Sequence, residues 1–366
     1  MSASPQAPTL QPRTIDEVVA AVRETPRLLP FGGGTKPALS LAPPGCASLG
    51  LCGLSGILEY DPGEYTFTAL AGTRLSEVAA ALAANGQYLP FDPPFADAGA
   101  TLGGAVGAGL SGAARQRYGG VRDFILGVRF VTGAGELARA GGKVVKNAAG
   151  FDLPKLFAGS LGRLGVIVEV SFKVFPRPPR TATLRAVFPD LGPALGALVR
   201  VNQAAFDVEA LDLEAPGVLW VRLGGSADTF TERMERLARL TGGVTTVLTE
   251  GSDQAAWERL QLRLLPPGST ALLVKVPVTA MAIPELDRLL GQAGADRRYG
   301  AGGNVAWITW PGTAAELDRF LRTQRLAGLV IQGAAGTPLL GATRGDNFRN
   351  RVKAALDPEG RFPGYH

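Results

Sequence analysis

Histidine is almost absent from the sequence, and this absence excludes several kinds of chemistry. Of 366 residues only His366, the last one, is a histidine. A Ser-His-Asp triad, a Cys-His pair or a cluster of imidazole metal ligands would each have to rely on that residue. We therefore set aside these hydrolytic and metal-dependent mechanisms.

Cysteine is nearly as scarce. Cys46 and Cys52 are the only two, whereas an iron–sulfur cluster usually takes four cysteines, and five intervening residues match no common zinc motif. We expect two buried, unreactive thiols and no metal centre. Such sparing use of cysteine favours a cytoplasmic protein.

The sequence also shows no pattern typical of a targeting peptide or a membrane span. Residues 1–12 are polar and Pro-rich, without a basic start or an apolar core, so we expect no signal peptide. The longest uncharged stretch, residues 98–114, consists mainly of Gly and Ala and is a poor membrane span. The net charge of +5 comes from scattered basic residues, mostly Arg, so we expect no nucleic-acid partner.

What the chain has is enough apolar sequence for two domains. It is 46% hydrophobic and 19% charged, with 49 glycines and 27 prolines, which is typical of a globular protein with many tight turns. Residues 13–177 alternate short predicted strands with Gly-rich loops, and the Pro pair at 178–179 marks a change of pattern. Two helices are predicted in this part, one after Thr14 and one over residues 77–84.

The second half is more regular. Predicted strands alternate with amphipathic helices in the order β-α-β-β-α-β, in one copy or two, which suggests ferredoxin-like α+β sandwiches. The strands are expected at 183–188, 208–213, 218–223, 272–278, 305–310 and 329–332, and the helices at 194–202, 229–240, 284–292 and 314–324. Residues 346–366 are expected to form a basic helix and a Pro/Gly tail.

The residues that suggest a ligand lie in the first half. The run Gly32-Gly33-Gly34-Thr35-Lys36 follows a strand predicted over residues 28–31, and successive glycines allow several backbone N–H groups to point at one anion. The run is neither a G-x-G-x-x-G nor a Walker A motif, so it does not predict a nicotinamide or P-loop site. By itself it is compatible with an ordinary Gly-rich turn.

Two further Gly-rich runs follow on the same scaffold. Residues 92–112 combine Gly, Ala and Ser around Thr101, Gly104 and Ser111, and residues 141–165 contain the third run. Such segments have little side-chain bulk, which suits a backbone lying against a large flat ligand. Three such loops predict one extended ligand.

These segments resemble the FAD-binding domain of the p-cresol methylhydroxylase and vanillyl-alcohol oxidase type. Residues 143–152 (Lys-Val-Val-Lys-Asn-Ala-Ala-Gly-Phe-Asp) and 159–170 are similar to the FAD-binding subunits of bacterial glycolate oxidases, and residues 356–364 resemble the ending of that family. The resemblance implies an α+β chain in three parts. These are an FAD-binding domain of two α/β subdomains over 1–178, a ferredoxin-like cap or substrate domain over 179–340, and a tail over 341–366 that returns to the FAD domain.

The resemblance also implies the contacts of the cofactor. The diphosphate is expected against Gly32, Gly33, Gly34, Thr35 and Lys36. Flavin and ribityl contacts are expected at Pro94, Thr101, Gly103, Gly104, Ser111 and Tyr118. Adenosine-side contacts are expected at Gly165, Val166 and Ile167. Thr35 stands where covalent members often carry a histidine, so the FAD is expected to be noncovalent.

The implied activity is oxidation of a small 2-hydroxy acid, glycolate to glyoxylate, by hydride transfer to the flavin. The expected partners are a second flavoprotein subunit and an iron–sulfur subunit that receives the electrons, with peripheral membrane association only through them. Related dehydrogenases grip the substrate with histidines around a metal, which this chain lacks. The sequence thus names no base and leaves two alternatives open: a stand-alone FAD-dependent 2-hydroxy-acid dehydrogenase, and a non-catalytic flavin-binding assembly subunit.

Overall fold

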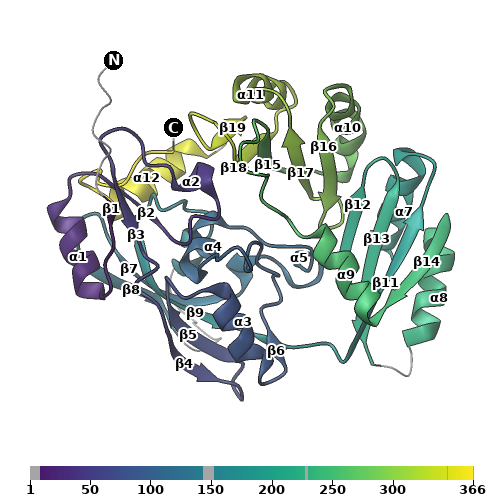
Figure 1. Cartoon of the computed structure of the whole chain (residues 1–366), viewed down its shortest axis with the longest axis horizontal. Helices are drawn as coiled ribbons and strands as arrows, with labels where there is room; N and C mark the ends of the chain where they lie inside the picture. The colour runs from purple at the N-terminus through teal and green to yellow at the C-terminus, as the bar shows by residue number, and fades with distance from the viewer. Residues whose placement is uncertain (1–8, 143–151, 227–229, 344, 366) are drawn as a thin grey trace. The chain divides into compact units, whose positions relative to one another are not determined.

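The computed structural model describes residues 9–142, 152–226, 230–343 and 345–365, and the chain forms two compact units (Figure 1). Unit 1 comprises Met1–Ser111, Gly120–Pro176 and Arg344–His366. Unit 2 comprises Gly112–Gly119 and Arg177–Thr343. The chain therefore leaves unit 1 after Ser111, returns to it at Gly120, and returns again at its end.

Strands of unit 1 form three sheets within the described residues. A parallel sheet has the order β1 (Thr9–Leu10), β3 (Ala47–Gly50), β2 (Leu28–Phe31). An antiparallel sheet has the order β4 (Ile57–Asp61), β5 (Thr66–Leu70), β9 (Val166–Lys173), β7 (Ile125–Val131), β8 (Leu137–Gly141). A small pair joins β6 (Gln87–Tyr88) and β10 (Phe175–Pro176).

Helices of unit 1 are short, and their starts follow local sequence signals. They are α1 (Ile15–Glu24), α2 (Pro37–Ser40), α3 (Leu75–Ala83), α4 (Leu102–Ala108), the 3-10 helix η1 (Val121–Asp123), α6 (Pro154–Phe157) and α12 (Asp346–Leu356). The Thr14 hydroxyl caps α1 by accepting a hydrogen bond from the Glu17 N–H at 3.2 Å. The Thr101 hydroxyl caps α4 in the same way through Gly104.

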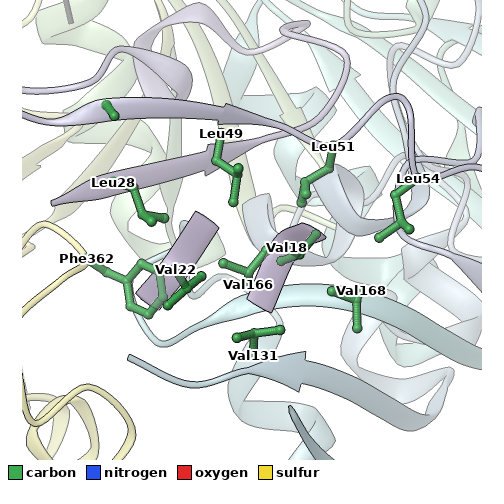
Figure 2. Packing of buried hydrophobic residues seen from close by; sticks show 11 residues of the cluster. Val18, Val22, Leu28, Leu49, Leu51, Leu54, Val131, Val166, Val168 and Phe362 are labelled. Atoms are coloured by element: carbon green, nitrogen blue, oxygen red, sulfur yellow. The ribbon is translucent and has the colours of Figure 1, made fainter. Parts of the chain in front are cut away.

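The core of unit 1 lies between the two larger sheets. Figure 2 shows Val18 and Val22 of α1 beside Val131 and Val166 of the antiparallel sheet, with Phe362 of the C-terminal tail packed among them. Burial of such side chains contributes about 1.5–3 kcal/mol each relative to their exposure. The tail is therefore an integral part of the unit 1 core.

Unit 2 is built on one sheet, nine-stranded within the described residues. Its order is β14 (Val244–Thr249), β11 (Arg180–Val187), β13 (Val218–Gly225), β12 (Val208–Glu214), β16 (Asp296–Gly300), β17 (Val305–Trp310), β15 (Leu272–Pro277), β18 (Ala327–Gln332), β19 (Leu339–Gly341). Its helices are α5 (Arg115–Tyr118), α7 (Leu191–Gln203), α8 (Phe230–Thr241), α9 (Glu250–Leu260), the 3-10 helix η2 (Ala280–Ala282), α10 (Ile283–Gln292) and α11 (Ala314–Thr323).

The β-α-β-β-α-β unit occurs twice in this sheet. The elements β11-α7-β12-β13-α8-β14 form one copy and β15-α10-β16-β17-α11-β18 the other, and β12 pairs with β16 where they meet. The mixed α+β class predicted from the sequence is thus confirmed. No helix among the described residues is long and apolar enough to cross a membrane.

Some elements were not predicted. Strand β16 was missed because its Asp-Arg-Arg-Tyr-Gly sequence is charged. In the structure Arg297 and Arg298 form ion pairs with Asp287 and Asp212. The edge strand β14 and helix α9 were missed as well. Cys46 is buried as expected, but Cys52 is only half-buried.

Candidate cofactor site

A pocket of about 680 Å³, counting the part open to solvent, lies in unit 1. The lining residues come from three segments and two single positions. The segments are Pro30–Ser40 without Pro37 and Ala38, the stretch from Thr101 to Ala108, and the stretch from Leu161 to Ile167, and the single positions are Leu51 and Ala71. All three Gly-rich runs thus contribute to one cavity.

The first wall is the loop that follows β2. The backbone N–H groups of Gly33, Gly34 and Thr35 donate no hydrogen bond to any of the described residues. Consecutive unpaired N–H groups carry partial positive charge and can satisfy the oxygens of one anion. The loop therefore has the donors that a phosphate group needs.

Lys36 adds a full charge to the same wall. Its side chain is buried, at 7% exposure, and its ammonium donates to the Thr35 hydroxyl at 3.0 Å and lies 5.6 Å from the centre of the Phe95 ring. No carboxylate among the described residues pairs with it, and burial lowers the pKa of Lys36 to about 8. A buried cation without an acidic partner is costly unless an anion joins it.

The glycines of the pocket have two different roles. A Cβ on Gly34, where φ is +67°, or on Gly107 would meet no atom within 4 Å, so both leave open space. In contrast, a Cβ on Gly32 would lie 2.0 Å from the Thr101 hydroxyl oxygen, and one on Gly33 would lie 2.0 Å from the Gly99 carbonyl oxygen. Gly32 and Gly33 are thus required by the contact between two loops, and Gly34 and Gly107 leave room for a ligand.

The loop before β9 forms a second wall. Gly165 and Ile167 line the pocket, but Val166 between them is fully buried in the hydrophobic core. Successive side chains of a strand point to opposite faces, so residues 165–167 cannot all face the cavity. The loop also supplies Leu161 and Gly162, which were not among the predicted contact residues.

The pocket brings together ten of the predicted contact residues. They are Gly32, Gly33, Gly34, Thr35, Lys36, Thr101, Gly103, Gly104, Gly165 and Ile167. Pro30, Phe31, Leu39, Ser40, Leu51, Ala71, Gly107, Ala108, Leu161 and Gly162 also line it. Of these, Gly107 and Gly162 lie inside the Gly-rich runs and are detectable there; Leu51 and Ala71 carry no local signal.

Four predicted residues lie outside the lining: Val166, which is buried in the core, and Pro94, Ser111 and Tyr118. Pro94 is half-buried, and the buried Ser111 hydroxyl accepts a hydrogen bond from the Val121 N–H at 3.0 Å. Tyr118 belongs to unit 2, where its hydroxyl donates to Glu209 at 3.0 Å. Burial raises the pKa of Glu209, although Tyr118 and Arg117 oppose this shift. The motif at 143–151 lies outside the described residues.

The geometry of this cavity suits flavin adenine dinucleotide (FAD). Unpaired N–H groups and the buried Lys36 match a diphosphate, while Leu51, Ala71 and Ile167 give apolar surface for ring systems. The open space at Gly34 and Gly107 allows a ligand to approach the backbone. The residues present therefore fit FAD.

Comparison with known proteins agrees with this site. The FAD binding domain family matches residues 7–141. The chain is 36% identical over 320 residues to glycolate oxidase subunit GlcE of Escherichia coli (strain K12), covering 84% of each protein. It is 27% identical over 281 residues to glycolate oxidase subunit GlcD of Bacillus subtilis (strain 168), covering 69% of this chain and 59% of that one.

Among solved structures, alkyldihydroxyacetonephosphate synthase has a similar fold, with a TM-score of 0.71 at 15% identity over 96% of this chain and 74% of that one. Fold and site together define an FAD-binding flavoprotein of the p-cresol methylhydroxylase type. More specifically, the chain belongs to the family of FAD-binding glycolate oxidase subunits. The predicted family and the predicted cofactor, FAD, are thereby confirmed.

Proposed function

We propose that this chain is the FAD-binding subunit of a glycolate oxidase-like complex that oxidises a small 2-hydroxy acid, glycolate to glyoxylate. Electrons then pass to an iron–sulfur subunit, and a second flavoprotein subunit completes the complex. The observation that carries the proposal is the pocket with its unpaired N–H groups and buried Lys36, in a chain that matches GlcE over 84% of its length. When bound, FAD supplies the hydride acceptor.

Different residues of the pocket hold different parts of the cofactor. Gly33, Gly34, Thr35 and Lys36 hold the diphosphate, because they combine N–H donors, a hydroxyl and a charge. The helix α4 residues around Gly103, Gly104 and Gly107 face the flavin half, and the loop from Leu161 to Ile167 faces the adenosine half. The FAD is bound noncovalently, because the threonine side chain at position 35 cannot form the histidyl linkage.

For the domains, we propose an FAD-binding domain over 1–178, a cap domain over 179–340 and a C-terminal segment over 341–366 that packs on the FAD-binding domain. The compact units support this division, since residues 177–343 cluster apart from residues 120–176 and 344–366. The compact units differ from this division at residues 112–119, because the contacts of these residues group them with unit 2. Arg117 and Tyr118 hold them there through Glu209.

The subunit role, as opposed to a stand-alone enzyme, follows from the missing histidines. Abstraction of a hydroxyl proton is most efficient with a base whose pKa lies near the working pH, usually a histidine. The single histidine is His366. We therefore place substrate oxidation chiefly on the partner flavoprotein.

The test is anaerobic reduction of the FAD-loaded chain by glycolate or D-lactate, followed at the flavin absorption band, with and without the partner subunits. We expect slow or undetectable reduction of the isolated chain and a marked rise when the partners are added. His366→Ala, the matched control, should change neither rate. Fast, saturable reduction of the isolated chain would favour the stand-alone dehydrogenase, and a complete complex in which only the partner's flavin is reduced would favour an assembly subunit.

A further inference from the structure

The segment that follows α12 is built around one buried carboxylate. The Asp357 side chain accepts hydrogen bonds from the N–H groups of Arg361 at 2.9 Å and Phe362 at 3.0 Å, and it forms an ion pair with Lys353. Lys353 also donates to the Phe362 carbonyl at 3.0 Å. A buried carboxylate with this many donors fixes the turn in one conformation.

This turn is attached to the strand that leads into the pocket. The Leu28 N–H donates to the Arg361 carbonyl at 2.9 Å, and Leu28 is the first residue of β2. Phe362 packs beside Leu28 in the core, as Figure 2 shows. Because β2 ends at Phe31, directly before Gly32, the tail braces the strand that carries the first pocket wall.

The last described residue of the tail reaches a second pocket wall. The Tyr365 hydroxyl donates to the Ser160 carbonyl at 3.2 Å, and the Tyr365 ring lies 4.9 Å below the Arg349 guanidinium of α12. Ser160 directly precedes Leu161 and Gly162, which line the pocket. Tyr365 therefore links α12 to the loop before β9.

Within that loop the Ser160 carbonyl also accepts a hydrogen bond from the Arg163 N–H at 2.9 Å, but several buried side-chain groups lack a partner. The Ser160 hydroxyl and the Nε and Nη1 atoms of Arg163 are buried without a hydrogen-bond partner among the described residues. On the α4 side the loop is held by the Leu161 N–H, which donates to the Gly107 carbonyl at 2.8 Å. Leu161 also has a φ of +55°, a conformation that the surroundings must enforce.

We propose that the C-terminal segment 353–365 is a cofactor-positioning element, in which Tyr365 holds the loop from Ser160 to Gly165 in its FAD-binding conformation. Asp357 fixes the turn, Phe362 anchors it in the core, and Tyr365 transmits that position to the pocket wall. This inference rests on the proposed FAD site and on the assignment of that loop to the adenosine half. Tyr365 is a positioning residue and has no role in electron transfer.

The experiment compares Tyr365→Phe with Tyr60→Phe. The control is matched, because the half-buried Tyr60 hydroxyl of unit 1 donates one hydrogen bond, to Gln87 at 3.0 Å, and lies outside the pocket lining. Apoprotein of each variant is titrated with FAD, ADP and FMN by calorimetry, and its thermal unfolding is recorded. ADP reports the adenosine half, and FMN lacks it.

We expect Tyr365→Phe to weaken FAD and ADP binding about fivefold, the effect of losing one hydrogen bond, with FMN binding unchanged. Tyr60→Phe should leave all three affinities unchanged. Unaltered FAD and ADP affinity in Tyr365→Phe, or equal weakening of ADP and FMN, would overturn the positioning role. If the wild-type chain bound neither FAD nor ADP, the proposed function itself would fail.

Discussion

Lys36 makes FAD binding depend on pH, and the direction follows from its burial. Burial lowers the pKa of Lys36 from its ordinary value near 10.5 to about 8 in the chain without ligand. One pKa unit corresponds to about 1.4 kcal/mol, so the folded chain carries a destabilisation of about 3 kcal/mol while this buried group is charged. A bound diphosphate removes that cost by pairing with the ammonium.

The sign can be worked out from proton binding. Between pH 8 and 10.5 the unfolded chain keeps the Lys36 proton and the folded apoprotein does not, so the stability of the apoprotein rises with pH in this range. FAD binding requires the proton, so the dissociation constant should be flat below about pH 7.5 and rise about tenfold per pH unit above about pH 8.5.

The assay is a fluorescence titration of apoprotein with FAD across this pH range. Lys36→Met should weaken binding about 10- to 100-fold at neutral pH, as expected for loss of a charged hydrogen bond of about 1.5–3 kcal/mol, and its affinity should not vary with pH. Lys36→Arg keeps a charge that does not titrate in this range, so it should bind without the pH dependence. Lys173→Met is a further control, because Lys173 also lies over an aromatic ring, Phe124, but outside the pocket. A wild-type dissociation constant that stays flat to about pH 9.5 would refute the reasoning.

The remaining tests concern the linkage of the cofactor, the pocket glycines and the independence of unit 2. Acid precipitation should release the FAD to the supernatant, since Thr35 replaces the linking histidine of covalent members; flavin in the pellet would contradict this. Gly107→Leu should fill open space and lower FAD affinity while the apoprotein melts no earlier, because leucine favours a helix over glycine by about 0.8–1 kcal/mol. Gly33→Ala should instead lower the melting temperature through collision with the Gly99 carbonyl, and equal melting of both variants would argue against two glycine roles. Asp253→Ala should destabilise unit 2 by about 3–5 kcal/mol, because this buried carboxylate pairs with Arg222. Calorimetry of the FAD-loaded chain should show that the unfolding of unit 1 is unaffected. A shifted FAD affinity would count against independent unfolding of the two units.

Local signals in the sequence were sufficient for the elements that obey a simple period or carry a cap. The strand β2 was predicted with its observed bounds, and the hydroxyl of Thr14 caps α1 as its spacing to Glu17 indicates. Helix α4 was missed, because three of the seven residues of Leu102–Ala108 are glycine, which has weak helix propensity. Its two large apolar side chains, Leu102 and Val106, are fully buried, so tertiary packing stabilises this helix.

For the site, the sequence located the loops but not the direction of each side chain. The motif at 165–167 was assigned to the cofactor as a block, although strand alternation sends Val166 into the core. Leu51 and Ala71 reach the pocket only because the chain folds back on itself, which no local pattern reports. Tyr118 shows the same limit, since its hydrogen bond to Glu209 joins residues 91 positions apart.

The glycines explain why a resemblance in loop sequence carries so much information about a cofactor. Gly33 is fixed by the Gly99 carbonyl and Gly32 by Thr101, so the first and second Gly-rich runs are mutually dependent even before a ligand binds. A side chain at Gly33 would therefore first separate the two loops. Gly34 and Gly107, by contrast, have no protein atom to accommodate. Gly34 also has a φ of +67°, which strains any side chain placed there, whereas Gly107 has no such restriction. The tolerance of side chains at Gly107 should therefore track ligand affinity alone, which makes it the better probe of the FAD site.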